Sequence, residues 1–139
     1  MKRSSLATQF ISSRKGRSKT ADERLVEEYF KHISESPSKT LELFTDDAIV
    51  YEPFSGDKAL HGKDEIAYFL KVARMANQGF QKEISFTDSN NTIGGIEAIV
   101  RFTKGASVVG KFQFKTADVQ IGKGIIERKI RELRIQFLK

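Results

Sequence analysis

Glu52 is the residue of this 139-residue chain whose surroundings point most directly to chemistry. It follows residues 48–51, AIVY, which alternate in character and are rich in β-branched and aromatic side chains, so we expect a strand. On that strand Val50, Glu52 and Phe54 share one face. If this face looks inward, desolvation disfavours the ionised carboxylate, which suits a group that takes and returns protons. The alternative is that the face points outward and Glu52 is a solvated side chain.

Other candidate motifs carry less chemistry. Residues 105–111, GASVVGK, imitate a phosphate-binding loop, but Phe112 stands where Ser or Thr should hold magnesium, and strands are expected on both sides of it. Two histidines and no cysteine argue against a dedicated zinc site, so we predict no metal ligands. His61 precedes Gly62 and is interpreted as a turn residue.

Helical spacing in the first half of the domain predicts three helices. The first runs from Asp22 to about Ser36, with Thr20 or Ala21 at its cap, and contains an amphipathic stripe that includes Tyr29. A second helix is expected from Pro37 to about Phe44, because Pro is favoured in a first turn. A third follows Gly62, ends around residues 77–79, and buries Ile66, Phe69, Leu70 and Ala73.

The chain after Gly79 reads as strands at residues 80–87, 95–104, 107–121 and 125–138. Short turns at 90–91, 105–106 and 122–124 supply the positive φ values that hairpins need, so we expect an antiparallel meander. The last strand has a helical alternative, and we favour a strand with a bulge near Arg131. Helices followed by a long curved antiparallel sheet predict an α+β domain whose three helices cover one sheet face and leave a pocket between the layers.

The formal charge of +6 arises in the first twenty residues. This segment holds six Lys and Arg residues and no acid, whereas the remainder has 18 basic and 18 acidic residues. Residues 1–20 are therefore interpreted as a basic flexible tail on a balanced domain, 21–139. The tail is either a disordered extension, a contact to nucleic acid or another anionic surface, or an organelle-targeting segment.

The composition indicates an ordinary soluble protein. Hydrophobic residues make up 39% of the chain and charged residues 30%, and no apolar run approaches the length of a membrane span. The absence of cysteine excludes disulfides and fits a reducing compartment, so we expect a cytoplasmic protein unless the tail is a transit peptide. Nucleic acid is expected as a partner only through the tail.

The order of elements, with LFTDDAIVYEPF, LHGKDEI and IRELRIQF, resembles the SnoaL-like and ketosteroid-isomerase-like branch of the NTF2-like superfamily over residues 22–138. The resemblance implies a cone-shaped curved sheet around an apolar cavity, commonly in a homodimer. This fold carries isomerases, cyclases, dehydratases, hydrolases and non-catalytic modules.

Three site residues follow from the resemblance. The family's general-base Asp before a Pro corresponds to Glu52 before Pro53, and its oxyanion-stabilising Tyr corresponds to Tyr29. Its second oxyanion donor corresponds best to Asp118, which shares a strand face with Phe112 and Phe114, although a slip of one residue would place Ala117 there. We expect the cavity to be lined by Val50, Phe54, Phe69, Phe112 and Phe114.

Two functions are consistent with these residues. The first is a cofactor-free acid-base enzyme, isomerase-like or cyclase-like, that acts on a small apolar carbonyl ligand in the cone cavity. The alternative is a non-catalytic module of the same fold that binds a ligand or a protein. In either case the basic tail could deliver the domain to an anionic surface.

Overall fold

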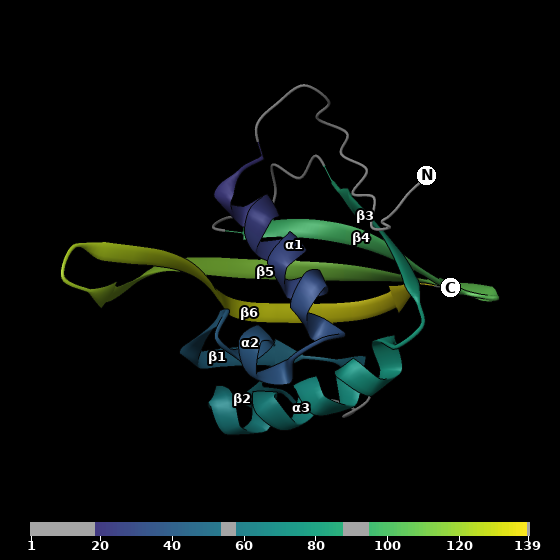
Figure 1. The fold of residues 1–139 in the computed structure, drawn as a ribbon, viewed down its shortest axis with the longest axis horizontal. Coiled ribbons are helices and arrows are strands. Elements are labelled where there is room, and N and C mark those ends of the chain that lie inside the picture. Colours follow the sequence, from purple (N-terminus) through teal and green to yellow (C-terminus); the bar gives the residue numbers. More distant parts are fainter. Residues whose placement is uncertain (1–18, 54–57, 88–94, 139) are drawn as a thin grey trace.

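The computed structural model describes residues 19–53, 58–87 and 95–138. The described residues form three helices and a six-stranded sheet of order β2-β1-β6-β5-β4-β3 (Figure 1). The helices are α1 (Ala21–Ile33), α2 (Pro37–Leu41) and α3 (Gly62–Asn77). The strands are β1 (Phe44–Tyr51), β2 (Leu60–His61), β3 (Gln81–Phe86), β4 (Gly95–Lys104), β5 (Ala106–Gly122) and β6 (Ile125–Leu138). The expected α+β class is confirmed.

Helix α1 begins with a reciprocal cap. The Glu23 backbone N–H donates to Thr20 Oγ1 at 3.1 Å, and the Thr20 N–H donates to Glu23 Oε1 at 3.0 Å. Two backbone donors at the start of the helix are thereby satisfied by side chains. This cap fixes where α1 starts and hence which of its residues face the sheet.

Thr20→Ala is expected to lower the free energy of unfolding by about 1 kcal/mol, because the Glu23 N–H loses its acceptor. Thr20→Ser keeps the hydroxyl and should retain most of the stability. Urea unfolding of the three proteins measures the difference. Equal stability of the Ala and Ser variants would show that the cap does not stabilise α1.

Helix α2 is shorter than the sequence predicts. It ends at Leu41, and Phe44, which was expected in the helix, instead starts β1 and is fully buried. The Ile130 N–H donates to the Leu43 carbonyl at 2.7 Å. The chain therefore pairs with β6 from Leu43 on, although the helical spacing of apolar residues continues to Phe44. Tertiary contacts therefore override a local pattern here.

Strands β3 to β6 form the expected antiparallel meander. Gly105 (φ 78°) and Gly124 (φ 70°) occupy the left-handed region at the two hairpin turns that the structure describes, and the third expected turn, 90–91, lies outside the described residues. The predicted bulge is confirmed at Arg131, since Lys115 pairs with Glu132 while Thr116 pairs with Ile130.

One edge of the sheet differs from a simple meander. Strand β1 pairs with β6 in parallel, and the short β2, which the sequence did not predict, pairs with β1. His61, expected in a turn, ends β2 and precedes α3, and its backbone N–H donates to Glu65 Oε1 at 2.8 Å. This arrangement brings the end of β1 under α3.

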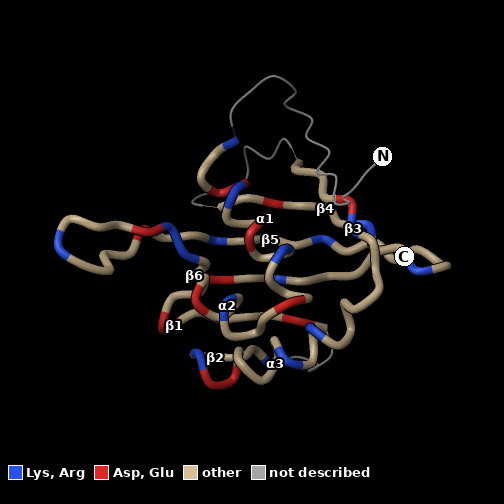
Figure 2. Tube along the Cα trace, in the orientation of Figure 1, with Lys and Arg blue, Asp and Glu red and all other residues tan. Residues whose placement is uncertain are grey.

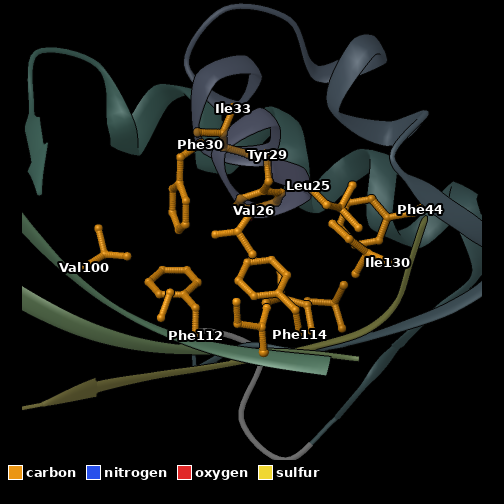
Figure 3. Close-up of a cluster of buried hydrophobic side chains, with 14 of the residues drawn as sticks. Leu25, Val26, Tyr29, Phe30, Ile33, Phe44, Val100, Phe112, Phe114 and Ile130 are labelled. Atoms are coloured by element: carbon orange, nitrogen blue, oxygen red, sulfur yellow. The ribbon is translucent and has the colours of Figure 1, made fainter. Parts of the chain in front are cut away.

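The core lies between the helices and the inner face of the sheet. Tyr29 and Phe30 of α1 point toward Phe112 and Phe114 of β5 (Figure 3). The rings of Phe30 and Phe112 meet edge to face with centroids 5.0 Å apart, and those of Tyr29 and Phe114 with centroids 5.6 Å apart. This aromatic cluster holds α1 in a fixed position over the sheet.

Acidic and basic residues are interspersed along the strands (Figure 2). Arg101 pairs with Glu83, and Gln113 donates to Glu97 across β4 and β5. None of the described helices is long and apolar enough to cross a membrane.

Candidate active site

An apolar cavity of about 370 Å³ lies between α1, α3 and the inner face of the sheet. Most of its wall is aromatic or aliphatic. Its lining residues are Tyr29, Phe30, Ile33, Glu52, Leu60, Tyr68, Phe69, Val72, Ala73, Ala76, Asn77, Phe80, Phe102, Val108, Phe112, Ile135 and Phe137. The size is within the range of small-molecule sites.

Glu52 supplies the carboxylate of this cavity. It directly follows β1, whose residue Val50 is paired with Leu60 of β2 on one side and Leu133 of β6 on the other. Glu52 is only 7% exposed and lines the cavity, so the inward alternative is the one observed. A carboxylate is thus held by the end of a strand against an apolar space.

Tyr29 supplies a phenol to the same cavity from the middle of α1. It is 2% exposed, and its ring is fixed by edge-to-face contacts to Phe30, Phe44 and Phe114. Burial raises the pKa of the Tyr29 hydroxyl above its ordinary value, because desolvation penalises the phenolate. The hydroxyl therefore keeps its proton and is available as a hydrogen-bond donor.

This shift in the pKa of Tyr29 predicts a loss of stability in alkali. The unfolded chain releases the tyrosine proton near pH 10, and the folded protein holds it to higher pH. The stabilising contribution is therefore complete below pH 10 and is lost as the pH rises above it. Tyr29→Phe should remove that part of the alkaline decline, measured as the urea unfolding free energy against pH.

Tyr68→Phe, which changes an exposed tyrosine, is the matched control. Lys82 works in the opposite direction, because burial lowers the pKa of its ammonium group, an effect that Glu35 partly offsets. Deprotonation of Lys82 removes the free-energy cost of its buried charge as the pH rises. Tyr29→Phe should therefore also be measured in a Lys82→Met background, which separates the effect of Tyr29 from that of Lys82.

An alkaline loss of stability that is identical in wild type and Tyr29→Phe would rule out the assignment to Tyr29.

Two of the expected hydrophobic lining residues are in place. Phe69 of α3 and Phe112 of β5 both line the cavity. Val50 and Phe114 do not, and this corrects the expectation: both are 0% exposed and belong to the close-packed core. The alternation of a strand predicts which face is inward but does not show whether that part of the face meets a helix or a cavity. Phe54 lies outside the described residues.

Asp118 is not part of the cavity, and this corrects the third expected site residue. It is on the predicted face of β5, but β5 and β6 extend beyond the helical layer (Figure 1), and its side chain is 60% exposed. Arg128 Nε lies 3.4 Å from both Asp118 Oδ1 and Asp22 Oδ1, and Thr116 Oγ1 donates to Asp22 at 3.0 Å. The first turn of α1 covers Thr116 but ends before Asp118.

Several lining residues were not anticipated from the sequence. Tyr68, Val72 and Ala76 recur at a spacing of four on α3, one stripe away from the buried Ile66 and Leu70. Asn77 adds an amide, whose Nδ2 donates to the Ala73 carbonyl at 2.7 Å. The regular apolar stripe Tyr68-Val72-Ala76 was the available signal, because a purely solvated helix face would be polar.

The site can perform proton transfer. One carboxylate and one protonated phenol border a mostly apolar space, so a bound carbonyl compound would meet a base and a hydrogen-bond donor away from bulk water. The described residues contain no group of three or more His, Asp or Glu residues that could hold a metal ion.

Comparisons with solved structures agree with this architecture. A ketosteroid isomerase-like protein from Erwinia carotovora atroseptica superposes with a TM-score of 0.66 at 15% identity, over 86% of this chain and 95% of that one. The chain has an NTF2-like fold. A candidate scytalone dehydratase from Novosphingobium aromaticivorans gives a TM-score of 0.61 at 18% identity, over 86% of this chain and 83% of that one.

A solved structure that is named for its association with another protein is also similar to this chain. The yeast UBP3-associated protein BRE5 gives a TM-score of 0.60 at 13% identity, over 88% of this chain and 99% of that chain. The sequence matches no protein-family profile and no curated protein. At these identities the likeness establishes the NTF2-like fold alone.

Proposed function

We propose that this NTF2-like protein is a cofactor-free acid-base enzyme that moves a proton between carbon atoms of a small apolar carbonyl compound. The observation that carries the proposal is that a buried carboxylate, Glu52, and a buried phenol, Tyr29, both line one apolar cavity. A carboxyl group that borders an apolar cavity can exchange a proton directly with a ligand bound there.

Glu52 acts as the base. For a β,γ-unsaturated ketone, its carboxylate takes a proton from the carbon between the carbonyl and the double bond, and the electron pair moves into a dienolate. The same carboxyl group then returns the proton to the γ carbon, which yields the conjugated ketone. The reaction is an isomerisation and consumes no other reactant.

Tyr29 stabilises the intermediate. The negative charge of the dienolate develops on the former carbonyl oxygen, and a phenol that keeps its proton can donate a hydrogen bond to it. Fixed edge-to-face packing of the Tyr29 ring means that this donor needs little rearrangement when charge develops. Asp118 has no part in this proposal, since it lies outside the cavity and is paired with Arg128.

Deuterium exchange tests the proposal without knowledge of the natural substrate. A panel of apolar ketones of increasing size, from 3-cyclohexenone to a decalone and a steroid enone, is incubated with the protein in deuterated water and followed by proton NMR. We expect at least one ketone to exchange its α protons faster than with Glu52→Gln protein. Equal rates with both proteins over the whole panel would contradict the proposal.

A non-catalytic binding module is the second candidate. The observation that favours it is the position of Asp118, because only two polar groups of the three expected converge in the cavity. In that case apolar ketones and phenols bind with little difference between wild type and Glu52→Gln, and no member of the panel is turned over. Calorimetric binding measured beside the exchange assay separates the two functions.

A further inference from the structure

Large apolar side chains surround the mouth of the cavity and face solvent. Tyr68 and Met75 of α3 are 72% and 74% exposed, and Val72 between them is also exposed. Val108 of β5 and the end of β6 complete the opposite side of the mouth. The apolar residues of this mouth surface are Tyr68, Val72, Met75, Val108 and Phe137. Exposed apolar residues gathered in one place mark an interaction site more often than scattered ones do.

Four of these residues also line the cavity, so the mouth surface and the cavity wall form one continuous apolar region. They are Tyr68, Val72, Val108 and Phe137. The register of β5 and β6 pairs Gly110 with Phe137, which lines the cavity, whereas Leu138 is the next residue of the strand and points to the opposite face of the sheet. An apolar molecule could therefore pass from whatever covers the mouth into the cavity without crossing a polar barrier.

The charged residues of the segments that supply the mouth surface are all basic. Residues 66–82, 98–117 and 133–138, which supply the mouth surface, contain no Asp or Glu. Lys71 lies three residues after Tyr68 and four before Met75, on the same outer stripe of α3, and Arg74 follows one turn later. Lys104 Nζ lies 5.6 Å from the ring of Phe80, a lining residue. The acidic residues of α3, Asp64 and Glu65, are at its other end, beside β2 (Figure 2).

We propose that the mouth surface docks on an anionic lipid bilayer, from which the cavity takes an apolar ligand. An amphipathic helix with Lys and Arg beside Tyr and aliphatic side chains is suited to lie in the interface plane of a bilayer. Lys71, Arg74 and Lys104 would meet anionic headgroups while Tyr68, Val72 and Met75 enter the acyl boundary. The occupant is a lipid surface because the mouth combines apolar groups with Lys71, Arg74 and Lys104, none of which forms an ion pair with an acidic residue of the described part of the chain.

This inference goes beyond the proposed function and does not depend on the chemistry of Glu52. Glu52→Gln protein should bind vesicles as wild type does. Loss of catalysis with normal docking, or the reverse, would therefore show which of the two proposals has failed.

Vesicle flotation of the full chain tests the docking. The probes are vesicles of equal parts phosphatidylcholine and phosphatidylglycerol, and vesicles of phosphatidylcholine alone. We expect binding to the anionic vesicles, and a decrease of about tenfold or more in the partition coefficient for the double variant Tyr68→Ser with Met75→Ser, because two large apolar groups no longer enter the bilayer. The lost side chains are exposed, so the thermal melting temperature should stay close to that of wild type.

The matched control removes two other exposed apolar side chains, 48% and 66% exposed, far from the mouth. Ile121 and Ile126, near the turn of the β5–β6 hairpin that extends beyond the helices (Figure 1), are changed to Ser in the same full chain. This control keeps the basic N-terminal residues, as does the mouth variant. Equal vesicle binding by the two double variants would overturn the proposal, since the binding would then come from the N-terminal residues or another surface.

Charge and a fluorescent reporter give independent readouts. Lys71→Glu with Arg74→Glu should weaken binding to the anionic vesicles by about tenfold or more and make it less dependent on salt. The chain contains no Trp, so Tyr68→Trp introduces a single reporter whose emission should shift to the blue on binding, whereas Ile126→Trp should not shift. If the mouth variants instead convert a dimer into a monomer and leave vesicle binding intact, the surface binds a second copy and the lipid proposal is wrong.

Discussion

Glu52→Gln is expected to lower the turnover of an apolar ketone by roughly 10²–10⁴-fold, the usual contribution of a positioned acid-base group. The amide has nearly the same shape as the carboxyl group but cannot accept a proton from carbon. Because Glu52 borders the cavity and the amide has nearly the same volume, the substitution should leave the fold intact. The effect should appear in kcat, with ligand affinity little changed.

Two further variants define that result. Glu52→Asp keeps the carboxylate but shortens the side chain by one methylene. It should be more active than the Gln variant and less active than wild type, because the carboxylate lies farther from the substrate carbon. Glu97→Gln changes a carboxylate on the polar outer face of the sheet, where it accepts from Gln113, and should leave turnover unchanged. Full activity in Glu52→Gln, or an equal loss in Glu97→Gln, would exclude Glu52 as the base.

Phe114→Ala is expected to lower the free energy of unfolding by roughly 3–5 kcal/mol, because it removes a large side chain from a filled space. Phe114 is 0% exposed and contacts the rings of Tyr29, Phe30 and Phe112. A loss of this size is a large fraction of the total stability of a typical domain, about 5–15 kcal/mol. Urea unfolding monitored by circular dichroism measures it.

Phe137→Ala is the matched comparison, since it removes the same ring from the mouth of the cavity. Phe137 is 38% exposed, so less apolar surface returns to water and the loss of stability should be clearly smaller. A larger loss for Phe137→Ala than for Phe114→Ala would contradict the assignment of Phe114 to the core and of Phe137 to the mouth.

Much of the fold could be predicted because local patterns and tertiary structure agree. The 3.6-residue spacing of α1, the Gly-marked turns at Gly105 and Gly124, and the bulge at Arg131 all follow from side-chain order along the chain. Strand alternation also placed Glu52 on the face of Val50, but it left open whether that face is inward, and the structure decides this. Strand β2 could not be predicted, since two residues carry no period.

The site was predicted less completely, for a physical reason that Asp118 illustrates. Alternation correctly placed Asp118 on the face of Phe112 and Phe114, but it does not report how far along the strand the helices reach. The cover ends at Asp22 and Thr116, and Asp118 lies beyond it. Val50 is missing from the cavity wall for a related reason, since it is fully buried in the core on a strand that α3 packs against.

The apolar stripe of α3 signals a contact surface, but the order of hydrophobic residues alone does not show that this surface borders a cavity. Tyr68, Val72 and Ala76 occupy positions that a single helix would present partly to solvent, and only the assembled sheet shows that they border a cavity. A cavity forms only where the helical layer and the sheet are held apart. The distance between the two layers depends on side chains from several elements, so no single segment of the sequence encodes it.

A co-crystal structure with 2-naphthol, a flat apolar phenol that mimics an enolate, tests the central claim most directly. The account predicts that the rings lie among the aromatic side chains of the cavity, with the naphthol oxygen about 2.5–3.0 Å from the Tyr29 hydroxyl and the Glu52 carboxylate facing the ligand. A naphthol bound elsewhere, or a cavity in which the Glu52 carboxylate points to bulk water, would contradict it.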